Sequence, residues 1–452
     1  MKKNRKSGNS ARKYFFIEAL GCPKNLVEAE VVAGSMISAG YGISFDPDQA
    51  DIYIICTCGF LPSARSEAAD SIAYASEWKS AVPGRIIAVA GCLLNHAEIS
   101  RFKQHFEAVD IWVPVNDTSR IPELLSGLPE KGDADGITFL ADENNVRMQF
   151  TLPHVAYLKI SDGCNNRCSY CAIPSLRGEL RSRTVAGIVT EAKQLIANGV
   201  KELVVIAQDL TAFGQDHPER NENAAKLLRA LDAIEGDFVL RLLYTHPAHY
   251  TDEFIDTVAN GVHILPYLDM PLQHISDRIL KEMNRHIDRA GIEDLLTRLR
   301  ERIPQLTLRT TFITGLPGET EAEFEELCEF AKKWKFDRFG VFSFAPEPGT
   351  PAAEMPGQIP AEIADERAGI LLKKQRGRMK RQQQKLIGSA VRAIFDYVDD
   401  ESGYGVARTM ADAPDIDNVV YFEPDDTVAP GDFITLEITG CSGSDLTGTV
   451  IR

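Results

Sequence analysis

Three cysteines in a short run carry the strongest chemical signal in this sequence. Cys164, Cys168 and Cys171, here called the local triad, form a C-x3-C-x2-C pattern directly after a predicted strand. Three thiolates this close can hold one metal centre and leave one coordination position open, where chemistry can occur. A structural zinc site usually has two C-x2-C pairs, and a second pair is missing here. The pattern therefore predicts a four-iron cluster with one open iron.

Three further cysteines form a group only when the strands around them are considered. Cys22, Cys58 and Cys92, here called the dispersed triad, each follow a predicted strand and adjoin a glycine. Loops after successive parallel strands gather at one edge of a sheet, so these thiols should converge and could hold a second cluster. The alternative is three separately buried cysteines that pack as small apolar side chains.

Three cysteines remain outside both triads. Cys56 lies two residues before Cys58, so on a strand both side chains would face the same side. Cys56 could therefore compete as a ligand, or it could pack in the core. Cys328 is expected in the core, on a helical face with Phe324 and Leu327, and Cys441 has no functional interpretation.

Two blocks of alternating strands and helices must position the cysteines. The first block has predicted strands at 14–20, 51–56 and 85–90, and helices at 25–39, 61–79 and 96–106. The second has strands at 155–160, 202–207, 238–244, 264–270, 306–314 and 337–344, and helices at 185–198, 224–234, 251–260, 277–301, 321–335 and 366–386. Such repeats predict parallel sheets covered by helices. Six units suggest a partial barrel with its site at the carboxyl ends of the strands.

The sequence changes character from residue 388 onward. Short β-rich runs at 391–398, 419–422, 433–438 and 446–451 predict a small antiparallel barrel of the OB type. The expected fold class is α/β, with an N-terminal parallel α/β domain, a central partial (β/α)6 barrel and this C-terminal barrel. The expected parts are a basic tail 1–13, domain 14–128, linker 129–149, domain 150–387 and domain 388–452.

Composition excludes several classes of protein. Hydrophobic residues make up 44% and charged residues 25% of the 452 residues, which is typical of a folded chain and excludes a mostly disordered one. The longest apolar stretch, 86–94, is too short for a membrane span, and no apolar segment follows the basic N-terminus. We therefore expect a cytoplasmic protein with reduced cysteines and no membrane partner.

The motifs resemble the radical S-adenosylmethionine (SAM) methylthiotransferases over nearly the whole chain. The local triad, with Tyr170 before its last cysteine, is similar to the radical SAM superfamily motif. Segments 21–25, 57–60 and 91–92 resemble the N-terminal methylthiotransferase domain, the tail resembles a TRAM domain, and 158–164, 268–274 and 410–414 also match. The resemblance is closest to the branch that modifies an aspartate of ribosomal protein uS12. One departure is Cys56, where the family usually has Asn, whereas Cys58 matches the family cysteine.

The resemblance implies two 4Fe-4S clusters and SAM as cofactors. The local triad's cluster would bind SAM and supply the electron that breaks it into methionine and a 5′-deoxyadenosyl radical, which abstracts hydrogen from an unactivated carbon. The dispersed triad's cluster would hold a sulfur that a second SAM methylates. The implied partners are uS12 or the small ribosomal subunit, a reductant such as flavodoxin or ferredoxin, and a sulfur donor.

Contacts to SAM are expected near the ends of the barrel strands. The turn 314–319 contains glycines that let the backbone approach a ligand, and its position matches the superfamily's SAM-binding segment. An ordinary strand–helix turn is the alternative, and Glu179 could either bind the SAM ammonium or pair with Arg181 or Arg183. The candidate cofactor-binding residues are Tyr170, Gly178, Glu179, Gln208, Gly315, Pro317 and Glu319. Asp209, Gln273 and His274 also end strands, without an assigned role.

Charge bears on the substrate. From residue 388 the tail has 13 acidic and 3 basic residues, a net charge of −10 out of −16 for the chain. This charge should repel phosphate and attract a basic ribosomal protein, which disfavours the alternative of a tRNA adenosine methylthiotransferase of the MiaB type. Segment 373–385, however, has seven basic and no acidic residues, and is either a solvated helix face or a contact with ribosomal RNA. A non-enzymatic iron–sulfur protein is a third alternative, but it would need closed four-ligand clusters.

Overall fold

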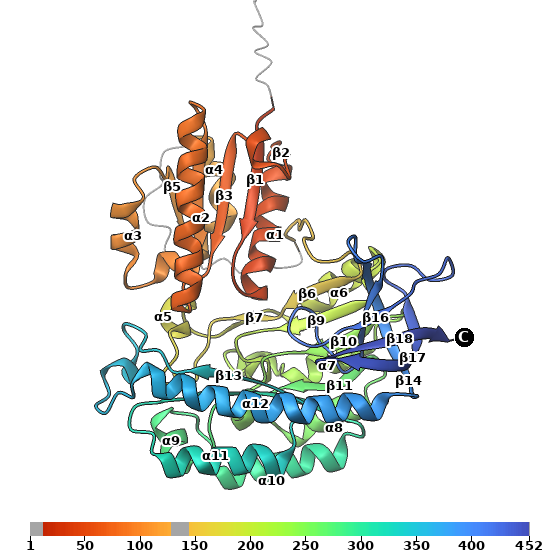
Figure 1. Cartoon of the computed structure of the whole chain (residues 1–452). Coiled ribbons are helices and arrows are strands. Elements are labelled where there is room, and N and C mark those ends of the chain that lie inside the picture. The colour runs from red at the N-terminus through yellow and green to blue at the C-terminus, as the bar shows by residue number, and fades with distance from the viewer. Residues whose placement is uncertain (1–11, 128–143, 452) are drawn as a thin grey trace, which may run out of the picture. The chain divides into compact units, whose positions relative to one another are not determined.

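The computed structural model describes residues 12–127 and 144–451, which form two compact units (Figure 1). Unit 1 comprises residues up to 150 together with 175–177, and unit 2 comprises 151–174 and 178 onward. Most of the expected tail 1–13 and linker 129–149 lies outside the described residues. Within the described ranges, no helix is long and apolar enough to cross a membrane.

Unit 1 is a five-stranded parallel sheet with helices on both faces. The strands are β1 (Tyr14–Ala19), β2 (Gly42–Ile43), β3 (Ile52–Thr57), β4 (Ile86–Gly91) and β5 (Ile111–Pro114), in the order β2-β1-β3-β4-β5. The helices are α1 (Pro23–Ser38), α2 (Pro62–Ala81), α3 (Ile99–His105) and α4 (Ile121–Leu125). Every residue of β3 is buried, because this central strand packs against apolar clusters on both faces. The predicted parallel sheet is confirmed, although the sequence pattern missed the short strands β2 and β5.

The first part of unit 2 is a six-stranded parallel sheet in the order β13-β12-β11-β10-β9-β6. Its strands are β6 (Val155–Lys159), β9 (Glu202–Ile206), β10 (Val239–Leu242), β11 (Ile264–Asp269), β12 (Thr307–Thr314) and β13 (Arg338–Ser343). The helices are α5 (Ile173–Arg177, whose last three residues belong to unit 1), α6 (Val185–Ala197), α7 (Ala224–Asp232), α8 (Asp252–Asn260), α9 (Asp277–Glu282), α10 (Arg289–Arg302), α11 (Glu321–Trp334) and α12 (Ala361–Leu386). The two end strands are not paired with each other, so the predicted partial barrel is confirmed.

Two predicted helices differ from the structure. The predicted helix 277–301 is divided into α9 and α10, because Asn284 and His286 adopt left-handed φ angles of 57° and 54° between them. The predicted helix 366–386 begins earlier, at Ala361, directly after Pro360. The hydrophobic pattern did not indicate the first boundary, because a tertiary contact holds this segment: Asn284 Nδ2 donates to the Arg167 carbonyl at 2.9 Å.

The two faces of the six-stranded sheet differ in chemistry. The face toward the helices is apolar and includes Leu158, Leu203 and Phe312. The other face carries buried charged residues, among them Glu202 and Arg241, which are both fully buried. A buried charge is costly unless it is paired, so this inner face must find partners.

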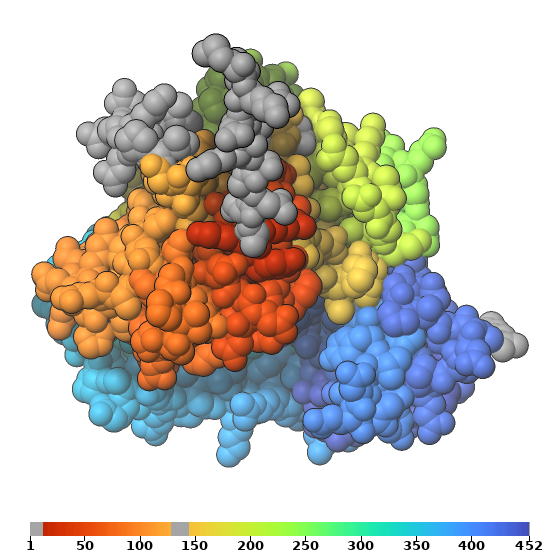
Figure 2. Space-filling view, turned by 90° about the horizontal axis from the view of Figure 1, so that it is seen from above, coloured from red at the N-terminus to blue at the C-terminus, as the bar shows by residue number. Residues whose placement is uncertain are grey.

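The C-terminal part of unit 2 is a closed five-stranded barrel (Figure 2, dark blue). Its strands are β14 (Ala390–Val398), β15 (Gly405–Thr409), β16 (Val420–Phe422), β17 (Phe433–Ser442) and β18 (Asp445–Ile451), in the order β14-β15-β16-β18-β17. The expectation of a purely antiparallel barrel is wrong at one pair, since β16 and β18 run parallel. The sequence pattern also missed β15, which is short and contains the charged residue Arg408.

The C-terminal barrel supplies the partners of the inner face. Arg408 pairs with Glu202 at 2.7 Å, and Asp412 pairs with Arg338 at 2.6 Å. Burial alone would raise the pKa of Glu202, but Arg408 and Arg241 lower it to about 2. Further contacts join Asp396 to His154, Asp415 to Tyr157, Asp417 to Tyr267 and Arg309, and the Met410 carbonyl to Arg241. Four of the tail's acidic residues therefore contact residues on or next to the six-stranded sheet.

Candidate active site

The dispersed triad gathers at the carboxyl edge of the unit 1 sheet. Cys22 precedes α1 directly after β1, Cys58 follows β3, and Cys92 follows β4. A hydrogen bond from the Cys58 thiol, with Arg177 and Lys24 nearby, holds the pKa of Cys22 well below its usual range despite burial. The same bond and burial raise the pKa of Cys58, and Cys92 is close enough to raise it further. The structure therefore brings together the three thiols that the sequence analysis grouped.

Glycines allow the three loops to approach one another. A Cβ on Gly21 would lie 2.4 Å from Cβ of Cys58, and a Cβ on Gly91 would lie 2.5 Å from the carbonyl oxygen of Thr57. Gly91 also has a φ of 109°, a conformation that disfavours other residues. Asn25 joins two of the loops, because its Nδ2 donates to the carbonyls of Leu20 at 2.6 Å and Cys56 at 2.9 Å.

Cys56 belongs to the core of unit 1. Its side chain is 2% exposed and lies in the apolar cluster that includes Ala33 and Ala90. Burial raises its pKa, and nearby Glu28 raises it further. Its environment is that of an apolar core residue, whereas Cys58 lies beyond the strand end with Cys22 and Cys92.

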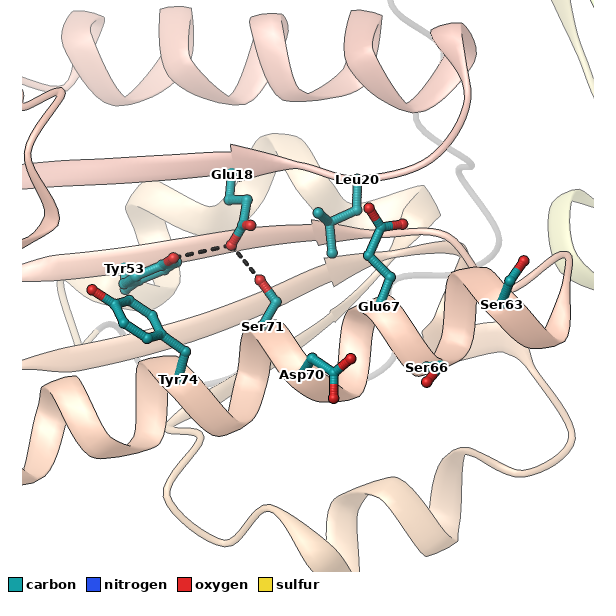
Figure 3. Close-up of a pocket in the computed structure, with 9 residues that line it drawn as sticks. All are labelled: Glu18, Leu20, Tyr53, Ser63, Ser66, Glu67, Asp70, Ser71 and Tyr74. Atoms are coloured by element: carbon teal, nitrogen blue, oxygen red, sulfur yellow. Dashed lines mark hydrogen bonds between the residues drawn. The ribbon is translucent and has the colours of Figure 1, made fainter.

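A separate hollow lies on the other face of the unit 1 sheet, toward α2 (Figure 3). It has a volume of about 720 Å³, and Glu18 forms its polar centre by accepting hydrogen bonds from Tyr53 at 3.0 Å and from Ser71. Burial and Glu18 raise the pKa of Tyr53. The hollow contains none of the six triad cysteines, and its central polar groups are bonded to one another.

The local triad lies in one loop of unit 2 after the short strand β7 (Ser161–Asp162). The loop is closed by a bond from the Cys164 amide to the Gly178 carbonyl at 3.2 Å. Gly163 has a φ of 75°, and a Cβ there would lie 2.0 Å from the carbonyl oxygen of Glu179. Burial raises the pKa of Cys164 to about 11 and that of Cys171 to about 12. A metal that binds these thiols must therefore displace their protons.

A segment that the sequence analysis missed supports the local triad. Between α9 and α10, the Asn284 Nδ2 donates to the Arg167 carbonyl at 2.9 Å, and the Met283 carbonyl accepts from the Ser169 amide at 3.0 Å. The buried guanidinium of Arg285 lies 3.6 Å from Sγ of Cys168. Burial would lower the pKa of Arg285, but Tyr170 and Cys168 raise it overall. The only signal in the sequence was the polar run within a predicted helix.

A polar cluster at the ends of β9 and β10 also contacts the cysteine loop. The Asp209 carboxylate accepts from Asn166 Nδ2 at 2.8 Å and lies 2.7 Å from His249 Nδ1. Burial would raise the pKa of Asp209, but His249 and His246 lower it to about 2. His246 is 4% exposed, and its Nε2 has no hydrogen-bond partner among the described residues. Asp209, His246 and His249 bring three potential ligand atoms within 4.8 Å of one another, and the sequence analysis noted only Asp209.

The turn 314–319 is organised by its own residues. The Glu319 carboxylate accepts from the Gly315 amide at 2.5 Å and pairs with Arg367 at 2.9 Å. Burial raises the pKa of Glu319 even though these donors oppose the shift. A Cβ on Gly315 would lie 2.3 Å from Cβ of Ala364, so this glycine is needed for packing against α12. The Glu319 side chain thus closes the turn, and Pro317 lies within it. Contact between this turn and SAM stays a prediction.

The other predicted SAM contacts occupy different environments. Glu179 is 82% exposed and lies 3.7 Å from Arg167. Its cationic neighbour is thus Arg167, rather than the Arg181 or Arg183 that the sequence analysis considered, and binding of the SAM ammonium by Glu179 stays a prediction. Gln208 donates to Asp162 at 2.8 Å, Gly178 ends α5 with a φ of 77°, and Tyr170 is half-buried beside Arg285.

Gln273 and His274 also differ in their surroundings. Gln273 has a φ of 72° and bridges to β12 through its backbone. His274 is fully buried, and its Nδ1 accepts from the Ser276 amide at 3.0 Å at the start of α9. Burial lowers the pKa of His274 to about 4, so this imidazole is neutral near pH 7.

The fold and the local triad together define the class of radical SAM enzymes. The radical SAM superfamily profile matches residues 158–331, that of the uncharacterized protein family UPF0004 matches 14–114, and that of the TRAM domain matches 387–451. Among solved structures, the radical SAM methyltransferase TsrM from Kitasatospora setae has a TM-score of 0.56 at 14% identity, covering 76% of this chain and 75% of that chain.

Curated relatives give a finer assignment. A protein of Geobacter sulfurreducens named ribosomal protein uS12 methylthiotransferase RimO is 40% identical, over 98% of this chain and all of the relative. The protein of the same name from Bdellovibrio bacteriovorus is 38% identical, over 97% of this chain and 98% of the relative. The chain therefore belongs to the RimO family of radical SAM methylthiotransferases. These comparisons confirm the expected class of cofactors, iron–sulfur clusters and SAM.

Proposed function

We propose that this protein adds a methylthio group to the β-carbon of an aspartate in ribosomal protein uS12. Full-length similarity to RimO proteins carries the proposal, and the two separate cysteine triads agree with it. A reaction that needs both a radical generator and a sulfur carrier requires two metal centres with different tasks. The tRNA alternative receives no support from the relatives named above, and the non-enzymatic alternative does not fit two sites with three cysteines each.

Both triads suit the cofactors chemically. Each offers three soft sulfur donors and leaves a fourth position of a cluster open for an external ligand. We assign Cys164, Cys168 and Cys171 to the cluster that binds SAM, and the dispersed triad to the auxiliary cluster. When bound, these groups supply the carbon-centred radical and the sulfur that is transferred.

The chain's own residues hold and tune the local site. Arg285 places a buried positive charge 3.6 Å from Sγ of Cys168, where it would favour a negatively charged cluster. Asp209 holds Asn166 and thereby fixes the loop between the first two cysteines. His246 presents an unpartnered Nε2 at the end of the neighbouring strand. We assign His246 to hydrogen bonding with SAM or with the substrate.

The tail supports a basic protein as the substrate. Four of its acidic residues contact the six-stranded sheet region, but most of the others remain exposed. A hollow of about 630 Å³ in the C-terminal barrel is lined by Asp399, Glu423, Tyr404 and Tyr421. Acidic and aromatic groups of this kind attract the Lys and Arg side chains of a ribosomal protein.

The remaining partners follow from the proposed chemistry. A reductant such as flavodoxin or ferredoxin must supply electrons, and a sulfur donor must replenish the transferred sulfur. Because uS12 is a ribosomal protein, the reaction would take place in the cytoplasm, on free uS12 or on the small subunit.

The test is a tryptic mass spectrum of uS12 from cells that lack the gene, compared with cells in which the wild-type or Cys168→Ala gene is restored. We expect a methylthio increment on one aspartate only with the wild-type gene. An unmodified uS12 in wild-type-restored cells would overturn the proposal. Methylthio-adenosine in tRNA from the same cells would then favour the tRNA alternative.

A further inference from the structure

A basic groove lies on the surface of unit 2 between α11 and α12. It has a volume of about 800 Å³, and seven of its lining residues are Lys or Arg while Glu329 is its one carboxylate. The lining comes from the C-terminal part of α11, from Phe339 of β13 and from residues 371–385 of α12. A groove with a net charge of +6 is unexpected on a chain whose overall net charge is −16.

Local structure explains only part of this charge. Arg378 donates to the carbonyls of Ala331 at 2.9 Å and Phe336 at 3.1 Å, and so satisfies the end of α11. Lys332 pairs with Glu329 at 3.2 Å. These two cations therefore have structural partners.

Other cations in the groove have no such partner. Lys373, Arg381 and Lys385 are exposed, and none has a carboxylate within 4.0 Å among the described residues. Like charges three or four residues apart on a helix are destabilising. These cations therefore lower the stability of α12 and leave an uncompensated positive potential in the groove.

We propose that this groove binds the phosphate backbone of folded RNA. Segment 373–385 is about 18 Å long at about 1.5 Å per residue, which spans several consecutive phosphates. Phe339, the one aromatic residue of the lining, is 8% exposed, so the groove offers no platform for stacking bases. The groove is therefore suited to backbone charge rather than to base sequence.

The proposal rests on the proposed function for the identity of the RNA. A ribosomal protein within an assembled subunit is surrounded by ribosomal RNA. The groove would then hold that RNA while the acidic C-terminal barrel contacts uS12. This division of tasks makes the assembled small subunit, rather than free uS12, the preferred substrate.

The binding test compares two double variants of the reconstituted full chain. Lys373→Glu/Arg381→Glu changes the groove, whereas Arg376→Glu/Lys380→Glu makes the same charge change on α12 outside the groove lining. The probe is a fluorescein-labelled RNA hairpin, measured by anisotropy at 50 and 200 mM KCl. We expect the groove variant to lose at least about tenfold in affinity at 50 mM KCl, with a shallower salt dependence, and the control to lose less than about threefold. Equal losses, or no binding by the wild type, would overturn the proposal.

A second measurement separates the groove from the proposed function. With assembled small subunits as substrate, the groove variant should show an increased KM and an unchanged kcat, while reductive SAM cleavage without substrate stays at the wild-type rate. A loss of SAM cleavage would mean that the groove residues serve the enzyme's own structure, which would overturn the proposal. If the wild type modifies no uS12, the proposed function fails, and RNA anisotropy still decides whether the groove binds RNA.

Discussion

Both cysteine triads provide three sulfur donors, but different parts of the fold bring those donors together. The local triad comes from a single loop of eight residues in unit 2, and a separate segment places Arg285 beside it. The dispersed triad comes from loops after three strands of unit 1, and close approach at Gly21 and Gly91 brings its thiols together. A metal site within one loop depends mainly on local sequence, whereas a site assembled from three loops depends on the whole sheet.

The largest expected effect separates the tasks of the two triads. Cys168→Ala and Cys92→Ala should each abolish methylthiolation of uS12, with a loss of at least about 100-fold, because each removes a cluster ligand. Only Cys168→Ala should also abolish reductive cleavage of SAM, measured as 5′-deoxyadenosine. Each variant should lose about half of the bound iron. Loss of SAM cleavage in Cys92→Ala would show that the two sites do not work independently.

The second effect concerns the dependence of the dispersed triad on the fold. Gly91→Ala should lower the free energy of unfolding of unit 1 by about 2–4 kcal/mol and reduce iron binding, because its Cβ meets backbone and its φ is 109°. The control is Gly40→Ala, which has a φ of 95° but no neighbour within 4 Å, and should cost only about 1 kcal/mol.

Urea unfolding followed by tryptophan fluorescence measures this difference, since Trp78 and Trp112 lie in unit 1. If Gly91→Ala and Gly40→Ala lowered stability equally, close loop approach would not be what assembles the dispersed triad.

The third effect is electrostatic and confined to the local triad. Arg285→Gln should make the local cluster harder to reduce, by on the order of 50 mV, because a buried positive charge near Cys168 is removed. A redox titration followed by electron paramagnetic resonance measures this shift, and the dispersed cluster should be unaffected. Arg278→Gln removes a cation that pairs with Glu282 and Glu323 instead, and it should leave both potentials unchanged.

The smallest effect tests the neighbour of Cys58. Cys56→Ala should keep the full iron content and lower the free energy of unfolding by about 1 kcal/mol, because it removes a buried side chain from the core of unit 1. Iron analysis and urea unfolding of the same preparation give both values. Loss of iron in Cys56→Ala would identify Cys56, rather than Cys58, as the ligand.

Sequence analysis succeeded where a signal was local or periodic. The spacing of residues predicted the local triad, all six strands of the unit 2 sheet, and β1, β3 and β4 of unit 1. It also predicted that Cys22, Cys58 and Cys92 follow strand ends. Arg285 and His246 were not predicted, because their positions beside the cysteine loop depend on where α9 ends and on the loop after β10. The turn between β12 and α11 lies where the sequence predicted it. That the Glu319 carboxylate pairs with Arg367 could be seen only in the structure. The parallel pairing of β16 and β18 likewise depends on barrel closure rather than on any pattern within either strand.

The contacts between the C-terminal barrel and the six-stranded sheet bear on how such a protein can evolve. A recombination event that exchanged this barrel alone would remove Asp412 and Asp417 and leave Arg338 and Arg309 without those partners. Breaking a buried ion pair costs about 3–5 kcal/mol, a large fraction of the stability of a typical domain. Substrate preference carried by the barrel is thus expected to be inherited together with the inner face of the sheet, rather than exchanged as an independent module.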